Sequence, residues 1–239
     1  MKDIKPYNNI ENKKRQIINM FDNISETYDL LNRVLSFQMD YLWRKIAIKN
    51  IKNNPTKILD VATGTCELAI IAAKYTNAKI TGIDISKKML NIGNKKIQKK
   101  NLSNRIGLKL ADAENLPFNN NSFQAITVGF GVRNFANINL GLLEIYRVLE
   151  KGGVLIILEP SKPSNFPIKQ LHEIYFTHIL PIIGKFISND KKAYQYLNNS
   201  VNAFPSTKKF LTNLNKIGFK NCQHIPLTCG IVSLYKAEK

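Results

Sequence analysis

The sequence predicts an α/β protein: a doubly wound, mostly parallel sheet with an antiparallel last strand and a helical cap. After Pro55, apolar runs that end in acidic residues or glycine alternate with helical segments, which is typical of buried parallel strands. The last two runs are separated by a turn too short for a parallel crossover, so they should pair as a hairpin. Between residues 160 and 205, segments rich in aromatic residues interrupt the alternation and should form the cap.

The chain is expected to divide into an N-terminal helical segment, 1–54, and a sheet domain, 55–239, that carries the cap at about 160–205. Apolar residues such as Ile17 and Phe21 recur at helical spacing in the first part. Ser86 should cap one helix, and Gly152-Gly153 should end another. The expected strands are 57–61, 79–84, 107–112, 125–129, 154–159, 219–227 and 230–235, and the main helices are 67–75, 86–100 and 139–149.

Charge and cysteine content limit the environment. The net charge of +18 suggests nucleic acid or an anionic membrane as a partner, although a bias toward A/T-rich codons for Lys, Asn and Ile explains it equally well. Three cysteines without C-x-x-C spacing fit a reducing compartment, and no metal site is apparent. No apolar stretch is long enough for a membrane span. We therefore expect a cytoplasmic protein, with peripheral contact at the inner face of the membrane left open.

Acidic residues follow three successive strands of the predicted sheet: Asp60, Asp84 and Asp112. The turn after the first strand contains a single glycine, Gly64, and matches G-x-G-x-x-G poorly, which disfavours a dinucleotide. Asp84 lies 20 residues after Gly64, where a carboxylate can accept hydrogen bonds from ribose hydroxyls. Asp112 could accept from the exocyclic amine of adenine beside the small Ala113. The sequence therefore indicates an adenosine-bearing ligand without a pyrophosphate, and S-adenosylmethionine fits best.

Each of these residues also has a plainer interpretation. A carboxylate at a strand end often only caps a helix or a turn, and Gly64 and Thr65 could serve the turn alone. Three carboxylates at successive strand ends favour a binding site. Cys66 is interpreted as a small residue packed at a helix start rather than a nucleophile.

The turn after the first expected strand, residues 62–66, is the expected cofactor loop. Several stretches outside it match the pattern of a known family. They are Phe21–Asn32, Ser36-Phe37, Leu42–Arg44, Phe130–Asn134, Tyr146–Leu149, Glu159–Pro163, Tyr194–Leu197 and Leu227–Val232. From about Phe21 to the C-terminus the chain resembles the ubiquinone/menaquinone biosynthesis C-methyltransferases, a class I S-adenosylmethionine-dependent family, and in particular the demethylmenaquinone methyltransferase type.

The resemblance implies a seven-stranded Rossmann-like methyltransferase sheet and methyl transfer from S-adenosylmethionine to a ring carbon of a polyprenylated quinol. It assigns cofactor contacts to Thr65, Asp84, Asp112 and Ala113. Asp60 at the end of the first strand and Gly64 in the turn after it are also expected to contact the cofactor. Gly129 is the seventh expected cofactor contact, and it stands where some members have a serine that contacts the cofactor. We expect demethylmenaquinol as the acceptor, with a benzoquinol of the ubiquinone pathway as the alternative.

Catalysis should lie just after the fourth strand, at Arg133 and Asn134. A ring carbon becomes nucleophilic as the neighbouring hydroxyl loses its proton, so Arg133 is expected to stabilise the phenolate and Asn134 to orient it. Asp29 is a candidate partner of Arg133. The cap histidines His172 and His178 are weaker candidates for a base. Apolar cap residues could line a channel for the prenyl tail: Phe176, Ile179, Leu180, Ile182, Ile183, Phe186 and Ile187.

Two other functions compete with this hypothesis. An RNA methyltransferase would suit the positive charge, but the sequence lacks both an Asn/Asp-Pro-Pro-aromatic turn and a catalytic cysteine near the fourth strand, so no nucleic acid is expected. A cofactor-binding scaffold for other quinone enzymes would bind cofactor without turnover. The sequence leaves open whether the chain forms a homo-oligomer.

Overall fold

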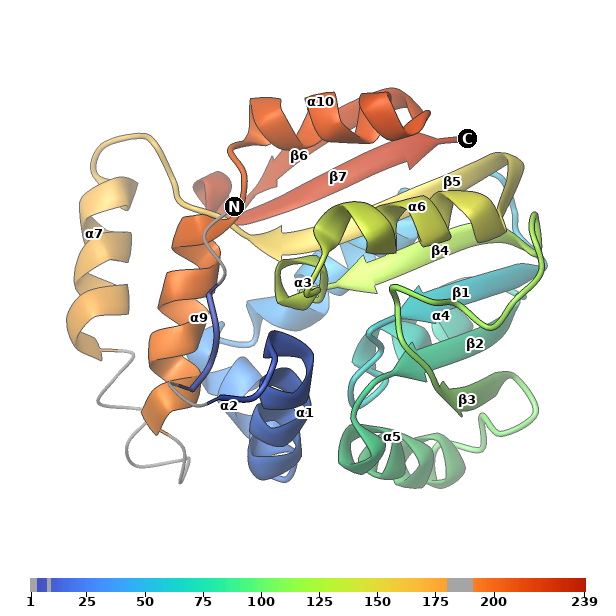
Figure 1. Cartoon of the computed structure of the whole chain (residues 1–239), viewed down its shortest axis with the longest axis horizontal. Coiled ribbons are helices and arrows are strands. Elements are labelled where there is room, and N and C mark those ends of the chain that lie inside the picture. Colours follow the sequence, from blue (N-terminus) through green and yellow to red (C-terminus); the bar gives the residue numbers. More distant parts are fainter. Residues whose placement is uncertain (1–3, 8–9, 180–190) are drawn as a thin grey trace.

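The computed structural model describes residues 4–7, 10–179 and 191–239, and within them the chain forms a seven-stranded sheet (Figure 1). The strand order is β3-β2-β1-β4-β5-β7-β6. The strands are β1 (Lys57–Val61), β2 (Lys79–Asp84), β3 (Ile106–Leu110), β4 (Phe123–Gly129), β5 (Leu149–Pro160), β6 (Lys220–Leu227) and β7 (Val232–Glu238). β7 pairs antiparallel with both β5 and β6, while β1 to β5 are parallel. The predicted fold class is confirmed.

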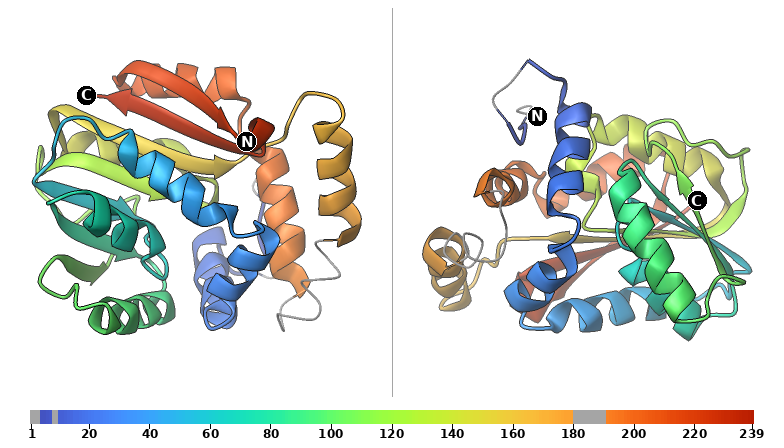
Figure 2. Two further views of the ribbon diagram at one scale, coloured as in Figure 1. Left: turned by 180° about the vertical axis from the view of Figure 1, so that it is seen from behind. Right: turned by 90° about the horizontal axis from the view of Figure 1, so that it is seen from below.

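Helices cover both faces of the sheet, as the turned views show (Figure 2). One apolar cluster joins the sheet to α3 (Met39–Lys49) and α4 (Glu67–Tyr75), and the other joins it to α6 (Ile138–Val148) and α10 (Thr207–Ile217). The strands supply both clusters because their side chains alternate: Ile58 and Leu59 are neighbours on β1, and each is fully buried on a different face. The sheet therefore separates two cores and leaves its strand ends free for a site.

Two local expectations had different outcomes. Ser86 caps α5 (Lys87–Lys99), as predicted, with its Oγ accepting from the Met89 amide at 3.1 Å. The prediction that Gly152-Gly153 ends the preceding helix is wrong, because α6 ends at Val148 and β5 starts at the next residue. The glycines instead lie where the β4–β5 register shifts, and Gly152 adopts a φ of +75°. A bulge and a helix stop both favour glycine, which explains the error.

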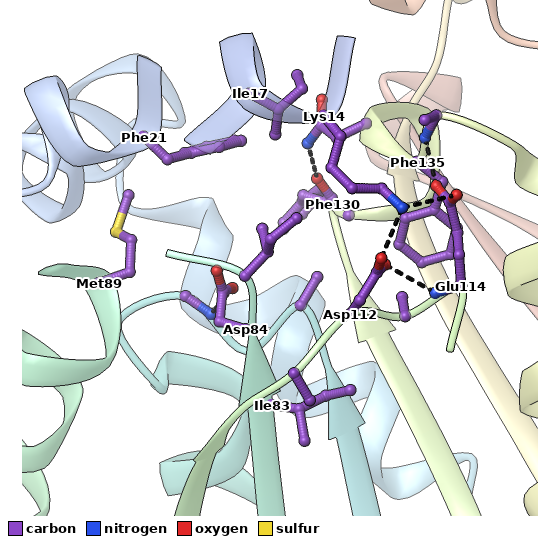
Figure 3. A pocket seen from close by; sticks show the side chains of 18 of the residues that line it. Lys14, Ile17, Phe21, Ile83, Asp84, Met89, Asp112, Glu114, Phe130 and Phe135 are labelled. Atoms are coloured by element: carbon purple, nitrogen blue, oxygen red, sulfur yellow. Dashed lines mark hydrogen bonds and ion pairs between the residues drawn. The ribbon is translucent and has the colours of Figure 1, made fainter. Parts of the chain in front are cut away.

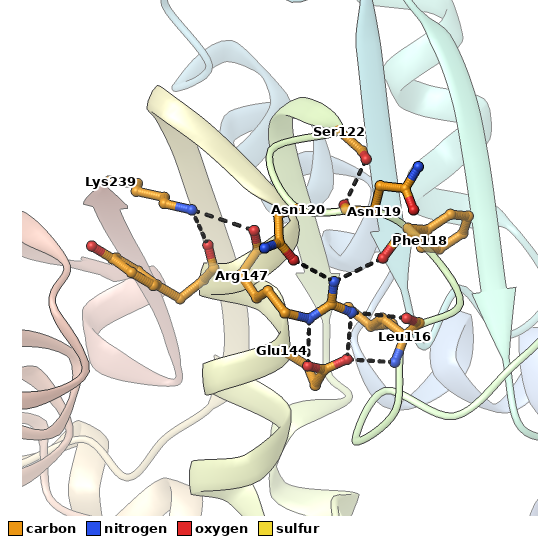
Figure 4. Close-up of polar contacts among 9 residues, drawn as sticks. Leu116, Phe118, Asn119, Asn120, Ser122, Glu144, Arg147 and Lys239 are labelled. Atoms are coloured by element: carbon orange, nitrogen blue, oxygen red, sulfur yellow. Dashed lines mark hydrogen bonds and ion pairs between the residues drawn. The ribbon is translucent and has the colours of Figure 1, made fainter.

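The loop after β3 is fastened to α6 by an arginine (Figure 4). The guanidinium of Arg147 pairs with Glu144 through Nε at 2.7 Å and Nη2 at 2.8 Å. It also donates to the carbonyls of Leu116 at 2.9 Å and Phe118 at 2.8 Å. Glu144 in turn accepts from the Leu116 amide at 2.8 Å. This loop begins at Asp112, so the arginine holds one side of the candidate cofactor site from a distance.

The remaining helices gather beyond the carboxyl ends of the parallel strands (Figure 1). Two precede the sheet, α1 (Lys13–Ile24) and α2 (Tyr28–Leu35), and two lie between β5 and β6, α7 (Ile168–Ile174) and α9 (Lys191–Ala203). In the described parts of the chain no helix is both long and apolar enough to cross a bilayer. Helices α1 and α2 of the N-terminal segment and α7 and α9 of the cap thus lie over the same end of the sheet, above the predicted site, while α3 packs on one face.

Candidate active site

A cavity of about 80 Å³ lies at the carboxyl ends of β1, β2 and β4. Its lining includes Gly64, Asp84, Asp112, Ala113 and Gly129, five of the seven residues predicted to bind a cofactor. Open parallel sheets bind ligands at this edge, where the strand order reverses between β1 and β4. The structure therefore brings these residues together.

Helix α1 forms the opposite wall of this cavity. In the close-up, Ile17 and Phe21 of α1 extend over the strand ends from the side opposite Asp84 (Figure 3). An apolar roof above a polar floor suits a ligand with an aromatic base and a hydroxylated sugar.

Asp84 at the end of β2 is held in one orientation. Its Oδ2 accepts from the Gly64 amide and its Oδ1 from the Ser86 amide, both at 2.8 Å. A carboxylate has roughly four acceptor sites, so each oxygen can still accept another hydrogen bond from a ligand. Burial raises the pKa of Asp84 to about 6 despite these amide donors. The φ of Gly64 is +55°, a conformation that glycine adopts without strain.

Asp112 lies two residues beyond β3 and forms an ion pair with a lysine of α1 (Figure 3). The Lys14 ammonium is 2.6 Å from Asp112 Oδ2 and 3.1 Å from Glu114 Oε2. Burial lowers the pKa of Lys14, but the hydrogen bonds to the two carboxylates outweigh it and raise the pKa overall. Sequence reasoning missed Lys14 and Glu114, because neither belongs to a recognisable pattern and they meet only through the fold.

Asp60 and Thr65 lie outside the lining of this cavity. Asp60 is 1 % exposed and accepts from the hydroxyls of Thr63 and Thr127, both at 2.6 Å. Burial raises its pKa to about 6. Both residues line a smaller pocket of about 30 Å³ behind Gly64 and Gly129, two residues that also line the first cavity. Asp60 therefore braces the turn, and a contact with a ligand would come from the smaller pocket.

The expected pair between Asp29 and Arg133 is wrong. Asp29 Oδ1 accepts from the Thr65 hydroxyl at 2.6 Å, and its Oδ2 lies 2.5 Å from the Lys96 ammonium. Lys96 also contacts Glu67 at 2.5 Å. Asp29 thus ties α2 to the loop after β1 and to α5, and both of its carboxylate oxygens have partners other than Arg133.

Arg133 pairs with Glu159 instead. Their side chains are 9 % and 1 % exposed, and Nη1 lies 2.9 Å from Glu159 Oε2. Nη1 also donates to the Phe130 carbonyl, Nε is buried without a hydrogen-bond partner, and Nη2 makes no hydrogen bond with a described residue. Burial raises the pKa of Glu159, against the effect of the guanidinium. A signal existed, because Glu159 is a further carboxylate at the end of an apolar run.

A second, larger cavity of about 540 Å³ adjoins the first. Its walls come from α1, α2, α3, α7 and α9, and their lining side chains are mainly apolar. Arg133 and Asn134 both line it, and the Tyr196 hydroxyl donates to Asn134 Oδ1 at 3.2 Å. Four residues line both cavities: Phe21, Tyr28, Phe130 and Asn134. Asn134 therefore lies where the two cavities meet, and Arg133 lies beside it in the larger one.

The cap contributes part of this cavity. His172 lines it, and burial lowers the pKa of the imidazole, whereas His178 is exposed and outside the lining. Of the expected tail channel, Leu180, Ile182, Ile183, Phe186 and Ile187 lie outside the described residues, as do the side chains of Phe176 and Ile179. That hypothesis stays a prediction.

Close packing explains the residue types at Cys66, after β1, and at Gly129, at the end of β4. Cys66 is fully buried, and burial raises its pKa to about 12, so the thiol is neutral at physiological pH. A Cβ on Gly93 of α5 would come within 2.3 Å of its Sγ, so the cysteine fits because Gly93 has no side chain. A Cβ on Gly129 would lie 3.1 Å from Leu68 Cδ2, which leaves little room for a serine.

The fold is the one found in Rossmann-like methyltransferases. Solved structures show the same fold, including a putative S-adenosyl-L-methionine-dependent methyltransferase from Methanococcus maripaludis, with a TM-score of 0.63, 24 % identity, and coverage of 98 % of this chain and 96 % of that one. The chain belongs to the ubiE/COQ5 methyltransferase family, whose profile matches residues 9–239. The predicted family and enzyme class, an S-adenosylmethionine-dependent methyltransferase, are confirmed.

Curated relatives match nearly the full length. The demethylmenaquinone methyltransferase of Bacteroides fragilis is 44 % identical over 238 residues, 99 % of this chain and 97 % of that protein. The ubiquinone/menaquinone biosynthesis C-methyltransferase UbiE of Geotalea daltonii is 45 % identical over 230 residues, 95 % of this chain and 97 % of that protein.

Proposed function

We propose that this enzyme transfers a methyl group from S-adenosylmethionine to a ring carbon of a demethylated polyprenyl quinol, and that demethylmenaquinol is its acceptor. The junction of the two cavities carries the proposal: a pocket with a ribose-type carboxylate, Asp84, adjoins an apolar cavity of about 540 Å³, and Phe130 and Asn134 line both. Relatives with 44 % identity that are named for demethylmenaquinone support the acceptor. A benzoquinol acceptor is the second candidate, supported by the name of the Geotalea relative.

The residues that line the cavity of about 80 Å³ suit the methyl donor. Asp84 would hold the ribose hydroxyls, Asp112 and Ala113 would face the adenine, and Gly64 leaves backbone space beside the sugar. When bound, S-adenosylmethionine supplies an electrophilic methyl group at a sulfonium. Phe21 and Ile17 would exclude water from above.

Arg133 and Asn134 act on the acceptor. The ring hydroxyl of the acceptor gives up its proton to water, which leaves negative charge on the oxygen and, through the ring, on the neighbouring carbon. That carbon would take the methyl group as the donor's carbon–sulfur bond breaks, and its own hydrogen would then leave as a proton while the oxygen is protonated again. The Nη2 of Arg133 makes no hydrogen bond within the described residues, and the guanidinium is already fixed in place by Glu159, so it can stabilise this oxygen with little reorganisation. Arginine stays protonated and therefore does not take the proton itself. Asn134, held by Tyr196, orients the ring with its side-chain amide.

The acceptor is tested by incubating the protein with methyl-labelled S-adenosylmethionine and each reduced precursor, demethylmenaquinol or the demethylated benzoquinol. Label in the menaquinone precursor supports the proposal, and preference for the benzoquinol selects the second candidate. Total RNA serves as the control acceptor, since label in RNA would support the competing hypothesis of an RNA methyltransferase. Cofactor binding without turnover on any quinol would mean a scaffold.

The same proposal places the protein in the cytoplasm with peripheral contact at the membrane that holds its acceptor. A net charge of +18 favours binding to anionic lipid. Such binding should weaken as salt shortens the Debye length from about 10 Å at 0.1 M to about 3 Å at 1 M. Binding that is insensitive to salt would assign the contact to apolar residues, and no binding would leave codon bias as the source of the charge.

A further inference from the structure

Helix α2 has an apolar face broader than the protein covers. Leu31 and Leu35 line the acceptor cavity at one side of this face. Leu30 and Val34 at its other side, and Phe37 just after the helix, are 56 %, 38 % and 76 % exposed. Exposed apolar side chains that adjoin one another in this way are suited to a partner.

A second group of exposed apolar side chains lies across the same cavity mouth, at α7. Phe166, Leu171 and Ile174 are 81 %, 59 % and 52 % exposed. The two groups are joined, because the Tyr175 hydroxyl donates to the Leu35 carbonyl at 2.9 Å and the rings of Phe37 and Tyr175 lie 6.0 Å apart. Together they form what we call the apolar rim: Leu30, Val34, Phe37, Phe166, Leu171 and Ile174.

The apolar rim is continuous with the acceptor site. Phe37, Leu171 and Ile174 are exposed and also line the cavity of about 540 Å³, so the same surface runs from solvent to the position of Arg133. Two exposed cations, Arg33 on α2 and Lys169 on α7, accompany it, against one exposed carboxylate, Glu173 on α7. Contiguous apolar area with flanking cations is the composition that binds an anionic lipid surface.

We propose that the apolar rim docks on an anionic bilayer, with α2 and α7 at headgroup depth and the acceptor cavity opening directly to the lipid. The choice of a bilayer over another protein rests on the proposed function. A polyprenyl tail gains about 0.8 kcal/mol for each CH₂ kept in hydrocarbon, so drawing the whole acceptor into water is unfavourable. Docking lets the ring enter the cavity while most of the tail stays in the membrane.

The test uses two matched double variants of the full chain. Leu30→Ser/Val34→Ser changes the rim at residues that do not line the cavity. The control, Leu140→Ser/Leu143→Ser, removes two leucines that are 43 % and 49 % exposed on α6 and belong neither to the rim nor to the cavity lining. Both variants are assayed for sedimentation with vesicles of phosphatidylglycerol and phosphatidylcholine. Turnover is measured on long-chain demethylmenaquinol in those vesicles and on a short-chain analogue in detergent.

We expect the rim variant to bind vesicles roughly tenfold more weakly than the control, in line with two apolar side chains lost from the interface. Turnover on the vesicle-borne acceptor should fall with binding, while turnover in detergent stays unchanged. Equal vesicle binding by the two variants would overturn the docking face. So would a wild-type dimer that the rim variant alone dissociates, since a second copy would then occupy the rim. If no quinol is methylated in detergent but the rim still governs vesicle binding, the proposed function fails and the docking face stands.

Discussion

Replacing Arg133 should lower the stability of the fold as well as the rate of methyl transfer. The guanidinium neutralises Glu159, whose side chain is 1 % exposed. Breaking a buried pair by deleting one partner costs about 3–5 kcal/mol, because the other charge stays buried and unpaired. At about 2–4 °C for each kcal/mol in a chain of this size, Arg133→Ala should melt about 6–20 °C below the wild type.

The pH dependence of this loss identifies its cause. Burial raises the pKa of Glu159 in the folded protein, and loss of the cation raises it further. A carboxyl with a raised folded pKa destabilises the fold only when it is ionised, so the deficit should be full above the folded pKa and should shrink as pH falls toward the unfolded pKa. Melting curves of Arg133→Ala and the wild type at pH 8 and pH 5 measure this difference.

A double variant separates stability from catalysis. Arg133→Met/Glu159→Gln removes both charges while glutamine keeps an acceptor for the Arg133-position amide, which lies 3.3 Å from Glu159 Oε1. It should melt close to the wild type. Its kcat should still be lower by about 10²–10³, with nearly unchanged affinity for S-adenosylmethionine, since only transition-state charge has lost its partner. Wild-type kcat in this stable variant would refute a catalytic role, and an Arg133→Ala that melts like the wild type would refute the buried-charge argument.

Three more predictions follow from the described contacts. Asp84→Asn should weaken S-adenosylmethionine binding by about 1.5–3 kcal/mol in calorimetry. The affinity of the wild type should fall as pH drops through about 6, where the Asp84 carboxylate takes up a proton, and the variant should lack this pH dependence. A thiol reagent at pH 8 should label the exposed Cys229 in the folded protein and reach Cys66, with its pKa of about 12, only after unfolding; early labelling of Cys66 would show that the loop opens. Arg147→Ala should lower the free energy of unfolding by about 1.5–3 kcal/mol, since its carbonyl and carboxylate bonds are lost; an unchanged urea midpoint would count against its bracing role.

The sequence predicted what depends on local pattern. Strands of a parallel sheet are short apolar runs, and their carboxyl ends share one edge, so Gly64 and Asp84 could be placed together before the structure was known. The partner of Arg133 could not, because Asp29 and Glu159 are both acidic and only the path of α2 decides between them. That choice depends on tertiary packing.

Lys14 illustrates the same limit. It occupies an ordinary position of an amphipathic helix, and it reaches Asp112 only because α1 crosses the strand ends. The Gly152-Gly153 pair shows the opposite error, in which a real local signal had two structural meanings. Sequence reasoning therefore succeeded where one segment determines the outcome and failed where two distant segments must meet.

The two cavities share α1 and α2 but differ in the rest of their walls. The strand ends supply the floor of the cavity of about 80 Å³, whereas the cavity of about 540 Å³ also takes lining residues from α3 and from α7 and α9, which lie between β5 and β6. An exchange of the segment with α7 and α9 between relatives would alter the acceptor cavity and leave the Asp84 and Asp112 floor and its α1 roof intact. Acceptor preference in this architecture can therefore evolve, or be engineered, through this one insertion, separately from the use of the methyl donor.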